Sequence, residues 1–251
     1  MTEHATDARI AVVTGASRGI GRAVAIALAK AGHHIVALAR TQGALDELDD
    51  EIRALGGSAT LVPLDLTDGP AIDRLGLSLY ERYGRVDVLV GNAGVLGPLS
   101  PLGHVDPRRF DEVMAVNVTA NWRLIRSLDP LLRQSAAGRA VFMTSGAAHK
   151  CRAYWGPYAI SKAALEAMVR TYAAETQNTS AVTANLFNPG PLRTRMRAQA
   201  MPGEDPMTLR TPEDAAPWIV RMVEPGETRT GLLFDFPTED WLVPQLPLPE
   251  A

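Results

Sequence analysis

Two residues that could exchange a proton, Tyr158 and Lys162, stand four positions apart in the stretch GPYAISKAAL. Pro157 and the helix-forming residues that follow predict a helix here, where positions i and i+4 share a face. A free phenol has a pKa of about 10. An ammonium about 4 Å away, at an effective dielectric near 20, favours the phenolate by about 4 kcal/mol. We therefore expect Lys162 to lower the pKa of Tyr158 toward the range that a general acid or base needs.

Tyr158 and Lys162 could also be an ordinary surface pair on a helix. A glycine-rich segment, TGASRGIG at residues 14–21, disfavours that alternative. Gly15, Gly19 and Gly21 follow a predicted strand and open a predicted helix, which is the context that a nucleotide-binding turn requires. In that place a pyrophosphate can meet backbone N–H groups and a helix N-terminus, and glycine lets the backbone approach closely. A plain tight turn is the alternative, and the position between strand and helix favours nucleotide binding over it.

Strands and helices that would position these residues alternate along the chain. Apolar strands are expected at Ile10–Thr14, Ile35–Ala39, Ala59–Leu64, Val86–Val90, Ala140–Thr144, Val182–Phe187 and Gly231–Phe236. Helices are expected at 19–31, 42–54, 70–83, 107–134, 158–177 and 212–223. Strands that are apolar throughout indicate a parallel sheet covered on both faces. We predict an α/β protein, a three-layer doubly wound Rossmann-like fold with about seven parallel strands, in which ligands bind beyond the carboxyl ends of the strands.

The composition and charge of the chain narrow the class of protein. A hydrophobic fraction of 46% and a charged fraction of 21% are typical of globular proteins, and the net charge of −3 gives no reason to expect nucleic-acid binding. No apolar stretch reaches the roughly 18 residues of a membrane span. The single cysteine, Cys151, fits a reducing compartment. We expect one cytoplasmic domain over residues 1–251, with a Pro-rich tail from about residue 237 and no metal site.

The glycine spacing G-x-x-x-G-x-G, together with Tyr-x-x-x-Lys, resembles the single-domain branch of the short-chain dehydrogenase/reductase (SDR) family. The resemblance covers nearly the whole chain, and the order and separation of its pieces make it specific. The pieces are TGASRGIG, Asp65 in PLDLTD, NAG at 92–94, Asn117 in AVNV, Ser145 in FMTSG, YAISK at 158–162 and NPGPLRT at 188–194. It implies an oxidoreductase that interconverts a carbonyl and a secondary alcohol by hydride transfer with a nicotinamide cofactor.

Four catalytic residues follow from the resemblance. Tyr158 would be the general acid and base at the substrate oxygen, and Ser145 would hydrogen-bond the same oxygen. Lys162 would lower the pKa of Tyr158 and hold the nicotinamide ribose, while Asn117 would hold a water beside the lysine. An ordinary turn serine and a helix-distorting asparagine are the alternatives at Ser145 and Asn117.

The resemblance also implies a set of cofactor-binding residues. Asp65 and Leu66 would meet the adenine, and the NAG segment would line the adenosine side, with Gly91 where the family often has a further Asn. The full set comprises Gly15, Ser17, Arg18, Gly19, Ile20, Gly21, Arg40, Asp65, Leu66, Asn92, Ala93, Gly94, Tyr158, Lys162, Pro189, Gly190 and Thr194.

The end of the second predicted strand bears on the choice between NAD and NADP. NAD-selective relatives carry an acidic residue there that binds the ribose 2′-hydroxyl. This chain has Ala39 in that place, followed by Arg40, and Arg18 of the glycine turn would face the same ribose. Because guanidinium groups grip phosphates with paired hydrogen bonds, we predict NADP (NADPH) as the cofactor. Arginines that merely face solvent are the alternative.

Several functional questions stay open at the level of sequence. A nucleotide-binding regulator of the same fold is the alternative function, which the intact Asn117, Ser145, Tyr158 and Lys162 disfavour. The Tyr–Lys spacing disfavours reduction of a C=C bond. The small-molecule substrate and the direction of reaction are not set by the sequence. The loop Arg193–Met207 could attract an anionic substrate or be a solvated basic loop. The helices at 107–134 and 158–177 often pair between subunits in the family, which implies a homodimer or homotetramer.

Overall fold

The computed structural model describes residues 8–244, and its centre is an eight-stranded sheet in the order β3-β2-β1-β4-β5-β6-β7-β8. Strands β1 to β7 run parallel, as predicted, and β8 pairs antiparallel with β7. The strands are Ile10–Thr14 (β1), His34–Ala39 (β2), Ser58–Pro63 (β3), Val88–Gly91 (β4), Arg139–Met143 (β5), Thr183–Asn188 (β6), Leu233–Asp235 (β7) and Asp240–Leu242 (β8).

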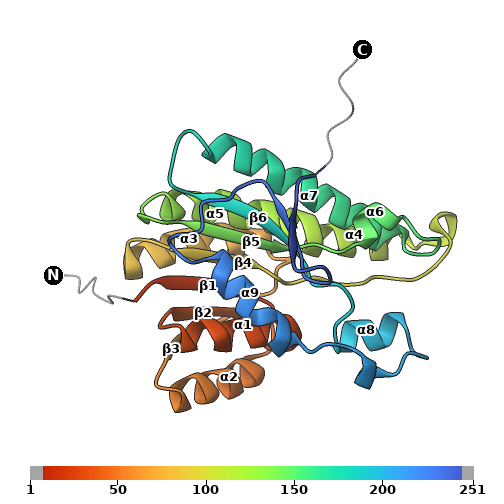
Figure 1. Ribbon diagram of the computed structural model, residues 1–251, viewed down its shortest axis with the longest axis horizontal. Helices are drawn as coiled ribbons and strands as arrows, with labels where there is room; N and C mark the ends of the chain where they lie inside the picture. Colours follow the sequence, from red (N-terminus) through yellow and green to blue (C-terminus); the bar gives the residue numbers. More distant parts are fainter. Residues whose placement is uncertain (1–7, 245–251) are drawn as a thin grey trace.

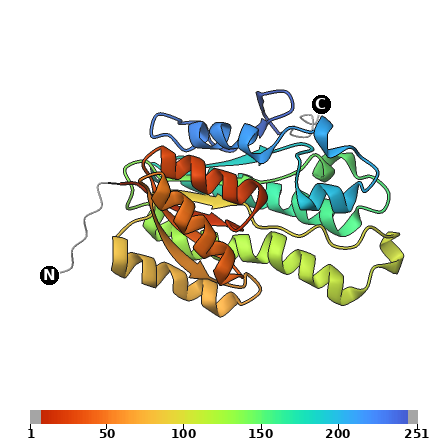
Figure 2. The same cartoon turned by 90° about the horizontal axis from the view of Figure 1, so that it is seen from below.

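Helices cover both faces of the sheet and complete three layers (Figures 1 and 2). One face carries α1 (Gly19–Lys30), α2 (Gln42–Ala54) and α9 (Pro212–Met222), and the other carries α3 (Gly69–Tyr83), α5 (Ala120–Leu132) and α7 (Gly156–Thr176). All residues of β1 are buried. Its alternate side chains enter the two cores, Ala11 and Val13 the first and Ile10 and Val12 the second, as the pleat of a strand requires. The predicted doubly wound fold is confirmed.

The predicted helix over 107–134 contains a change of helical pitch. It consists of α4 (Pro107–Met114), a π-helical turn η2 (Ala115–Thr119) and α5. Wide turns of this kind often mark functional sites, and this one carries the fully buried Asn117. The local periodicity of the sequence cannot show the extra residue, because the flanking segments keep a helical pattern.

Strand β8 occupies part of the segment that was expected to be a Pro-rich tail. The chain reverses after β7, where the Thr238 hydroxyl donates to the Asp235 carboxylate at 2.9 Å and Glu239 takes a φ of 56°. Trp241 of β8 then packs edge-on against Phe234 at 5.4 Å between ring centroids. Residues 245–251 of that tail lie outside the described residues.

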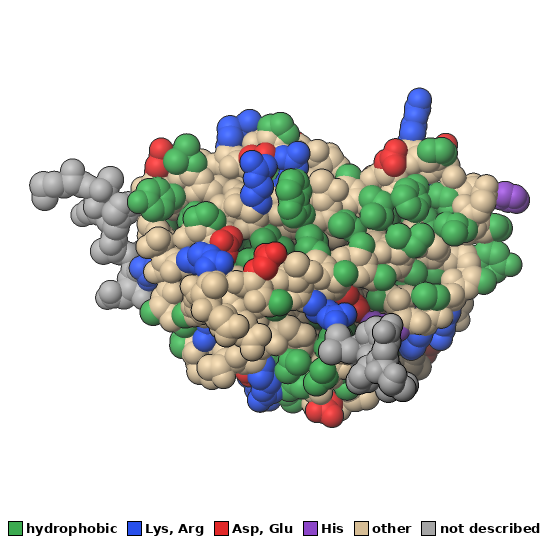
Figure 3. Space-filling model, turned by 90° about the horizontal axis from the view of Figure 1, so that it is seen from above, with side chains coloured by type: hydrophobic (Ala, Val, Ile, Leu, Met, Phe, Trp, Pro, Cys, Tyr) green, Lys and Arg blue, Asp and Glu red, His purple; other side chains and the backbone are tan. Residues whose placement is uncertain are grey.

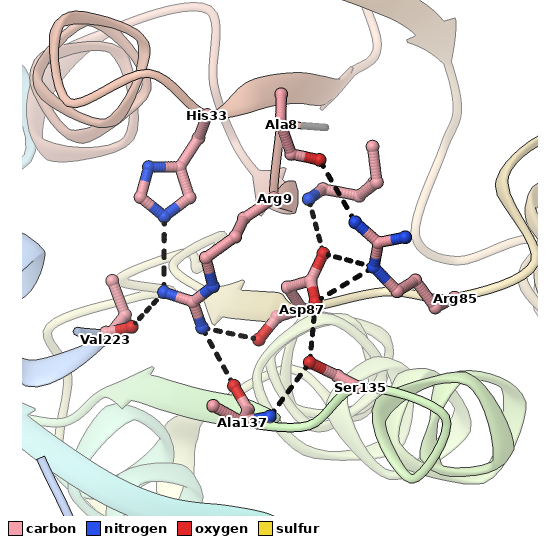
Figure 4. A network of polar contacts seen from close by, with 9 residues as sticks. Ala8, Arg9, His33, Arg85, Asp87, Ser135, Ala137 and Val223 are labelled. Atoms are coloured by element: carbon pink, nitrogen blue, oxygen red, sulfur yellow. Dashed lines mark hydrogen bonds and ion pairs between the residues drawn. The ribbon is translucent and has the colours of Figure 1, made fainter. Parts of the chain in front are cut away.

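A polar network closes the amino ends of β1 and β4 (Figure 4). The buried carboxylate of Asp87 accepts from the backbone N–H of Ile10 at 2.8 Å, from the Ser135 hydroxyl at 2.6 Å and from the Arg85 guanidinium at 3.2 Å. Beside it, Arg9 donates to the carbonyl oxygens of Val223 and Ala137. These bonds fix the end of the sheet that lies opposite the glycine turn.

Short helices gather at the other end of the sheet. These are α6 (Ala147–Lys150) and α8 (Arg195–Ala200), which Figure 1 shows beyond the carboxyl ends of the strands, with the 3₁₀ turns η1 (Leu102–His104) and η3 (Pro206–Thr208). None of them was expected from the sequence, since each is too short to show a period. Within residues 8–244, no helix combines the length and apolar character that a membrane crossing requires.

Candidate active site

A cleft of about 1570 Å³ lies at the carboxyl ends of the strands. It brings together residues from the glycine turn, the ends of β2, β4, β5 and β6, and the start of α7. Of the residues proposed from the sequence, Gly21 and Asn117 are buried and do not line the cleft. The others line it: Gly15, Ser17, Arg18, Gly19, Ile20, Arg40, Asp65, Leu66, Asn92, Ala93, Gly94, Ser145, Tyr158, Lys162, Pro189, Gly190 and Thr194.

The glycine turn has the form that a pyrophosphate needs. Gly15 and Gly19 have φ values of 65° and 57°, which favour glycine. A Cβ on Gly19 would meet nothing closer than the Thr194 methyl at 3.8 Å, whereas one on Gly21 would lie 2.4 Å from the Asn92 amide. Helix α1 begins after Arg18 without a side-chain cap, so its first N–H groups are open to an anion in the cleft. This donor set fits a dinucleotide phosphate.

Asn92 fixes the glycine turn to the end of β4. Its side-chain amide donates to the carbonyl oxygen of Thr14 at 2.8 Å, and its backbone N–H donates to the Thr14 hydroxyl at 2.9 Å. A Cβ on the preceding Gly91 would lie 2.3 Å from the Phe142 ring and 2.7 Å from the Asn121 amide oxygen. The structure therefore leaves little room for a side chain at Gly91.

Tyr158 and Lys162 lie on the first two turns of α7 and are both buried, with exposed fractions of 8% and 3%. The Lys162 ammonium donates to the carbonyl oxygen of Met143 at 2.7 Å and lies 5.7 Å from the centroid of the Tyr158 ring. Burial lowers the pKa of Lys162 to about 8, and the negative charge of Glu166 opposes that shift. The pKa of this buried ammonium is thus below that of an ordinary lysine.

The pKa of Tyr158 differs from the expectation that rested on spacing. Burial raises the pKa of this phenol, and the neighbouring Ser145 side chain acts in the opposite direction. The net direction of the shift is therefore opposite to the one expected from the spacing of Tyr158 and Lys162. The reason is that burial removes the phenol from water, which disfavours its charged form more than the Ser145 hydrogen bond favours it.

Ser145 lies in the turn between β5 and α6, and its hydroxyl accepts from the backbone N–H of Ala147 at 3.2 Å. Asn188, at the end of β6, holds the same turn, because its side-chain oxygen accepts from Gly146 at 3.2 Å and from Gly190 at 3.1 Å. Its amide donates to Asp235 at 2.6 Å. The sequence motif NPGPLRT contains Asn188, but no role was predicted for it. An asparagine at a strand end, just before Pro-Gly, is the pattern that indicates such a role.

Asn117 binds protein groups with both ends of its side chain. Its oxygen accepts from the backbone N–H of Val95 at 2.8 Å, and its amide donates to the Val95 carbonyl and to the Ser161 hydroxyl, both at 2.9 Å. A Cβ on Gly94 would lie 3.3 Å from the Asn117 oxygen and 3.6 Å from the Lys162 ammonium. Asn117 therefore ties the loop after β4 to α7 beside Lys162.

Apolar side chains form one wall of the cleft, beside Tyr158. Leu96, Tyr158 and Ala200 form a small buried cluster, with Trp155 and Met196 packed against it. The Trp155 and Tyr158 rings meet edge to face at 6.1 Å between centroids. This side of the cleft suits an apolar group next to the reacting atom.

The opposite side of the cleft is polar and positively charged. Arg18 and Arg40 are exposed and line it, and Ala39 is buried at the end of β2. Within residues 8–244, neither arginine has an ion-pair or side-chain hydrogen-bond partner. Hydrogen bonds from Thr67 to the Asp65 carboxylate, at 2.9 Å from the backbone and 2.8 Å from the hydroxyl, lower the pKa of Asp65. Its negative charge is thereby fixed at the end of β3.

Comparison with known proteins identifies the family. The family model for short chain dehydrogenase matches residues 9–205. The chain belongs to the short-chain dehydrogenase/reductase family of oxidoreductases. It is 38% identical over 231 residues to the oxidoreductase YciK of Escherichia coli (strain K12), a match that covers 90% of this chain and 91% of the relative.

Two further SDR proteins have names that mention a cofactor. An NADPH-dependent pterin aldehyde reductase from Arabidopsis thaliana is 33% identical over 189 residues, which cover 75% of this chain and 77% of the relative. A crystal structure of a short chain dehydrogenase from Shigella flexneri 2a str. 301, complexed with NADP, has a TM-score of 0.87 and 36% identity, and the match covers 94% of this chain and 99% of that chain.

Proposed function

We propose that this SDR protein is an NADP-dependent oxidoreductase that interconverts a carbonyl and a secondary alcohol. The observation that carries the proposal is that Ser145, Tyr158 and Lys162 line one cleft together with the uncapped start of α1. A protein that only binds a nucleotide has no need of a buried tyrosine beside a buried lysine. The alternative of a regulator without turnover is therefore the weaker reading of this site.

The residues of the site divide the chemistry between them. NADPH, when bound, supplies the hydride that reduces the carbonyl carbon. Tyr158 donates its phenol proton to the carbonyl oxygen, and Ser145 holds that oxygen by a hydrogen bond, which gives the alcohol. The Lys162 ammonium, 5.7 Å from the ring, stabilises the phenolate that remains. The apolar wall at Leu96 and Trp155 keeps water from the reacting atoms.

The proposed NADP preference is supported by the charge at the end of β2. Arg18 and Arg40 line the cleft there, and Ala39 supplies no carboxylate that would repel a 2′-phosphate. The NADP complex of the Shigella flexneri protein and the NADPH dependence of the Arabidopsis thaliana reductase agree with this choice.

A substrate screen tests the proposed activity. The purified protein is given NADPH and a panel of aliphatic and aromatic aldehydes and ketones, and NADPH oxidation is followed by absorbance. We expect turnover of at least one aromatic or branched apolar carbonyl, since the wall beside Tyr158 is apolar. Tight NADPH binding without turnover of any carbonyl, or of any secondary alcohol with NADP in the reverse direction, would favour the regulator.

Self-association is the second part of the proposal. Helices α5 and α7 expose Trp122 and Ile160, with exposed fractions of 47% and 39%, and Figure 3 shows hydrophobic side chains gathered on one part of the face seen from above. Contiguous exposed apolar patches often mark contacts between proteins. We propose a homodimer or homotetramer; light scattering of the purified protein, with Trp122→Glu as the disrupting variant, measures its mass.

A further inference from the structure

Glu166 is a buried carboxylate on the helix face that carries the catalytic pair. It follows Lys162 by four residues and Tyr158 by eight, so the three side chains share one face of α7. The exposed fraction of Glu166 is 6%, and the residue lines the cleft. A charged side chain is rarely buried to this extent unless it is paired, so its partners show what it does.

The two oxygens of Glu166 bind residues on both sides of Ser145. The Thr144 hydroxyl, directly before Ser145, donates to one oxygen at 2.6 Å. The Nε2 atom of His149, in α6 just after Ser145, lies 2.8 Å from the other. These contacts attach the turn that bears Ser145 to the helix that bears Tyr158.

The surroundings of Lys162 contain few compensating charges. Its ammonium bonds the Met143 carbonyl from β5 and lies over the Tyr158 ring from α7. A Cβ on Gly94, in the loop after β4, would lie 3.6 Å from it. Among these groups only Tyr158 titrates, and its burial favours the neutral phenol. Glu166 is the charged residue that favours the ammonium form of Lys162, and His149 is the titratable group that contacts Glu166.

We propose that Glu166 is a positioning residue for this reaction: fixed between Thr144 and His149, it keeps the buried Lys162 in its ammonium form beside Tyr158. The proposal concerns Lys162, a residue of the proposed oxidoreductase site, yet it can be tested without turnover. In this proposal Glu166 acts through Lys162 and not on the substrate.

The chain offers a direct measurement, because it contains three lysines: Lys30, Lys150 and Lys162. Protein labelled with ¹³C at the lysine side chains gives three sets of signals, and Lys30→Arg and Lys150→Arg variants assign the exposed pair. The pKa of Lys162 is then read from the pH dependence of its Cε signal in the cofactor-free protein. We expect Glu166→Gln, which keeps an acceptor for Thr144, to lower this pKa by about one unit.

Two variants separate charge from structure. Glu166→Asp keeps the charge and should restore at least half of the lost shift, whereas Glu175→Gln, the same change on an exposed position of α7, should leave the pKa of Lys162 unchanged. A pKa of Lys162 that is the same in wild type and in a folded Glu166→Gln protein overturns the proposal. If Glu166→Gln does not fold, the pKa of Lys162 in Glu166→Asp is compared with its value in Glu175→Asp. A lower pKa in Glu166→Asp supports the proposal, and equal values overturn it.

A second readout uses activity with a carbonyl found by the substrate screen. In Glu166→Gln, the limb of the kcat/KM profile that reports Lys162 should move to lower pH, whereas a merely structural role would reduce kcat/KM equally at every pH. Absence of turnover in the wild type would count against the oxidoreductase proposal and would leave the ¹³C result for Glu166 as it stands.

Discussion

The ammonium of Lys162 lies 5.7 Å from the centroid of the Tyr158 ring and bonds the backbone carbonyl of Met143 at 2.7 Å. The lysine is thus held by the end of β5, the strand that leads to Ser145, as well as by its own helix. The hydrogen bond thus joins the helix of Tyr158 and Lys162 to the strand that leads to Ser145, and the energetic cost of this arrangement is the burial of two titratable groups.

The first prediction concerns Tyr158. Tyr158→Phe removes the proton donor and keeps the ring that packs on Trp155, so cofactor affinity should stay within a few-fold of wild type. A positioned acid typically contributes about 10²–10⁴ in rate, and kcat should fall by that factor on a substrate from the screen. Tyr80→Phe, at an exposed tyrosine of α3, is the matched control. Turnover within about tenfold of wild type would remove Tyr158 from the mechanism.

The second prediction follows from the pKa of Lys162, which burial lowers from 10.5 to about 8. The unfolded chain binds this proton more tightly than the folded protein does, so stability rises as the pH rises from about 8 toward 10.5. Between pH 8 and 9.5 this single group adds about 1.5 kcal/mol to the free energy of unfolding. Urea denaturation at both pH values should show the increase in wild type, and it should be absent in Lys162→Met. Equal pH dependence in the two proteins would mean that Lys162 titrates normally.

The sequence predicted the parts of the site that depend on local pattern. The apolar runs of β1 and β4, the three glycines after β1 and the Tyr–Lys spacing each lie within a few residues, and short-range geometry decides them. Contacts between distant segments could not be found in this way. The Asn188–Asp235 bond joins residues 47 apart, and the Thr144–Glu166 bond joins residues 22 apart.

The error in the pKa of Tyr158 has the same origin. Spacing on a helix places two side chains on one face, but it does not show which atom the ammonium bonds or how far the phenol is removed from water. Likewise, β8 depends on the reversal at Thr238 and Glu239 and on the contact of Trp241 with Phe234. Nothing in the alternation of polar and apolar residues in that segment indicates a strand.

The third prediction tests the network at the amino ends of the strands. In the native protein, one carboxylate oxygen of Asp87 accepts from the Ile10 N–H and the other accepts from the Ser135 hydroxyl. Asp87→Asn leaves a single side-chain oxygen for these two donors. The free energy of unfolding should fall by about 2–3 kcal/mol, since a buried donor is left unpaired. Asp46→Asn, at an exposed position of α2, should change it by less than about 0.5 kcal/mol. NADPH affinity should not change in either variant, because both positions lie away from the cleft.

The fourth prediction concerns the single thiol. Cys151 is exposed and ends α6 with a φ of 42°, and its thiol donates to the Ala148 carbonyl at 3.8 Å. We assign the thiol no chemistry, so Cys151→Ser should keep activity within a few-fold of wild type. Alkylation of Cys151 in the wild type should slow turnover only through the bulk of the added group. Loss of activity in a folded, NADPH-binding Cys151→Ser protein would show that the thiol has a role.

The last prediction concerns cofactor choice. With Arg18 and Arg40 at the cleft and Ala39 in place of an acidic residue, NADPH should bind at least about tenfold more tightly than NADH, a difference of about 1.4 kcal/mol. The double variant Ala39→Asp, Arg40→Ala should reverse the order, because it adds a carboxylate for the ribose 2′-hydroxyl and removes a phosphate partner. Arg74→Ala, at an exposed position of α3 outside the cleft, should leave both affinities unchanged. Calorimetric titration of the three proteins with both cofactors measures this, and equal affinities in the wild type would show that the two arginines serve another purpose.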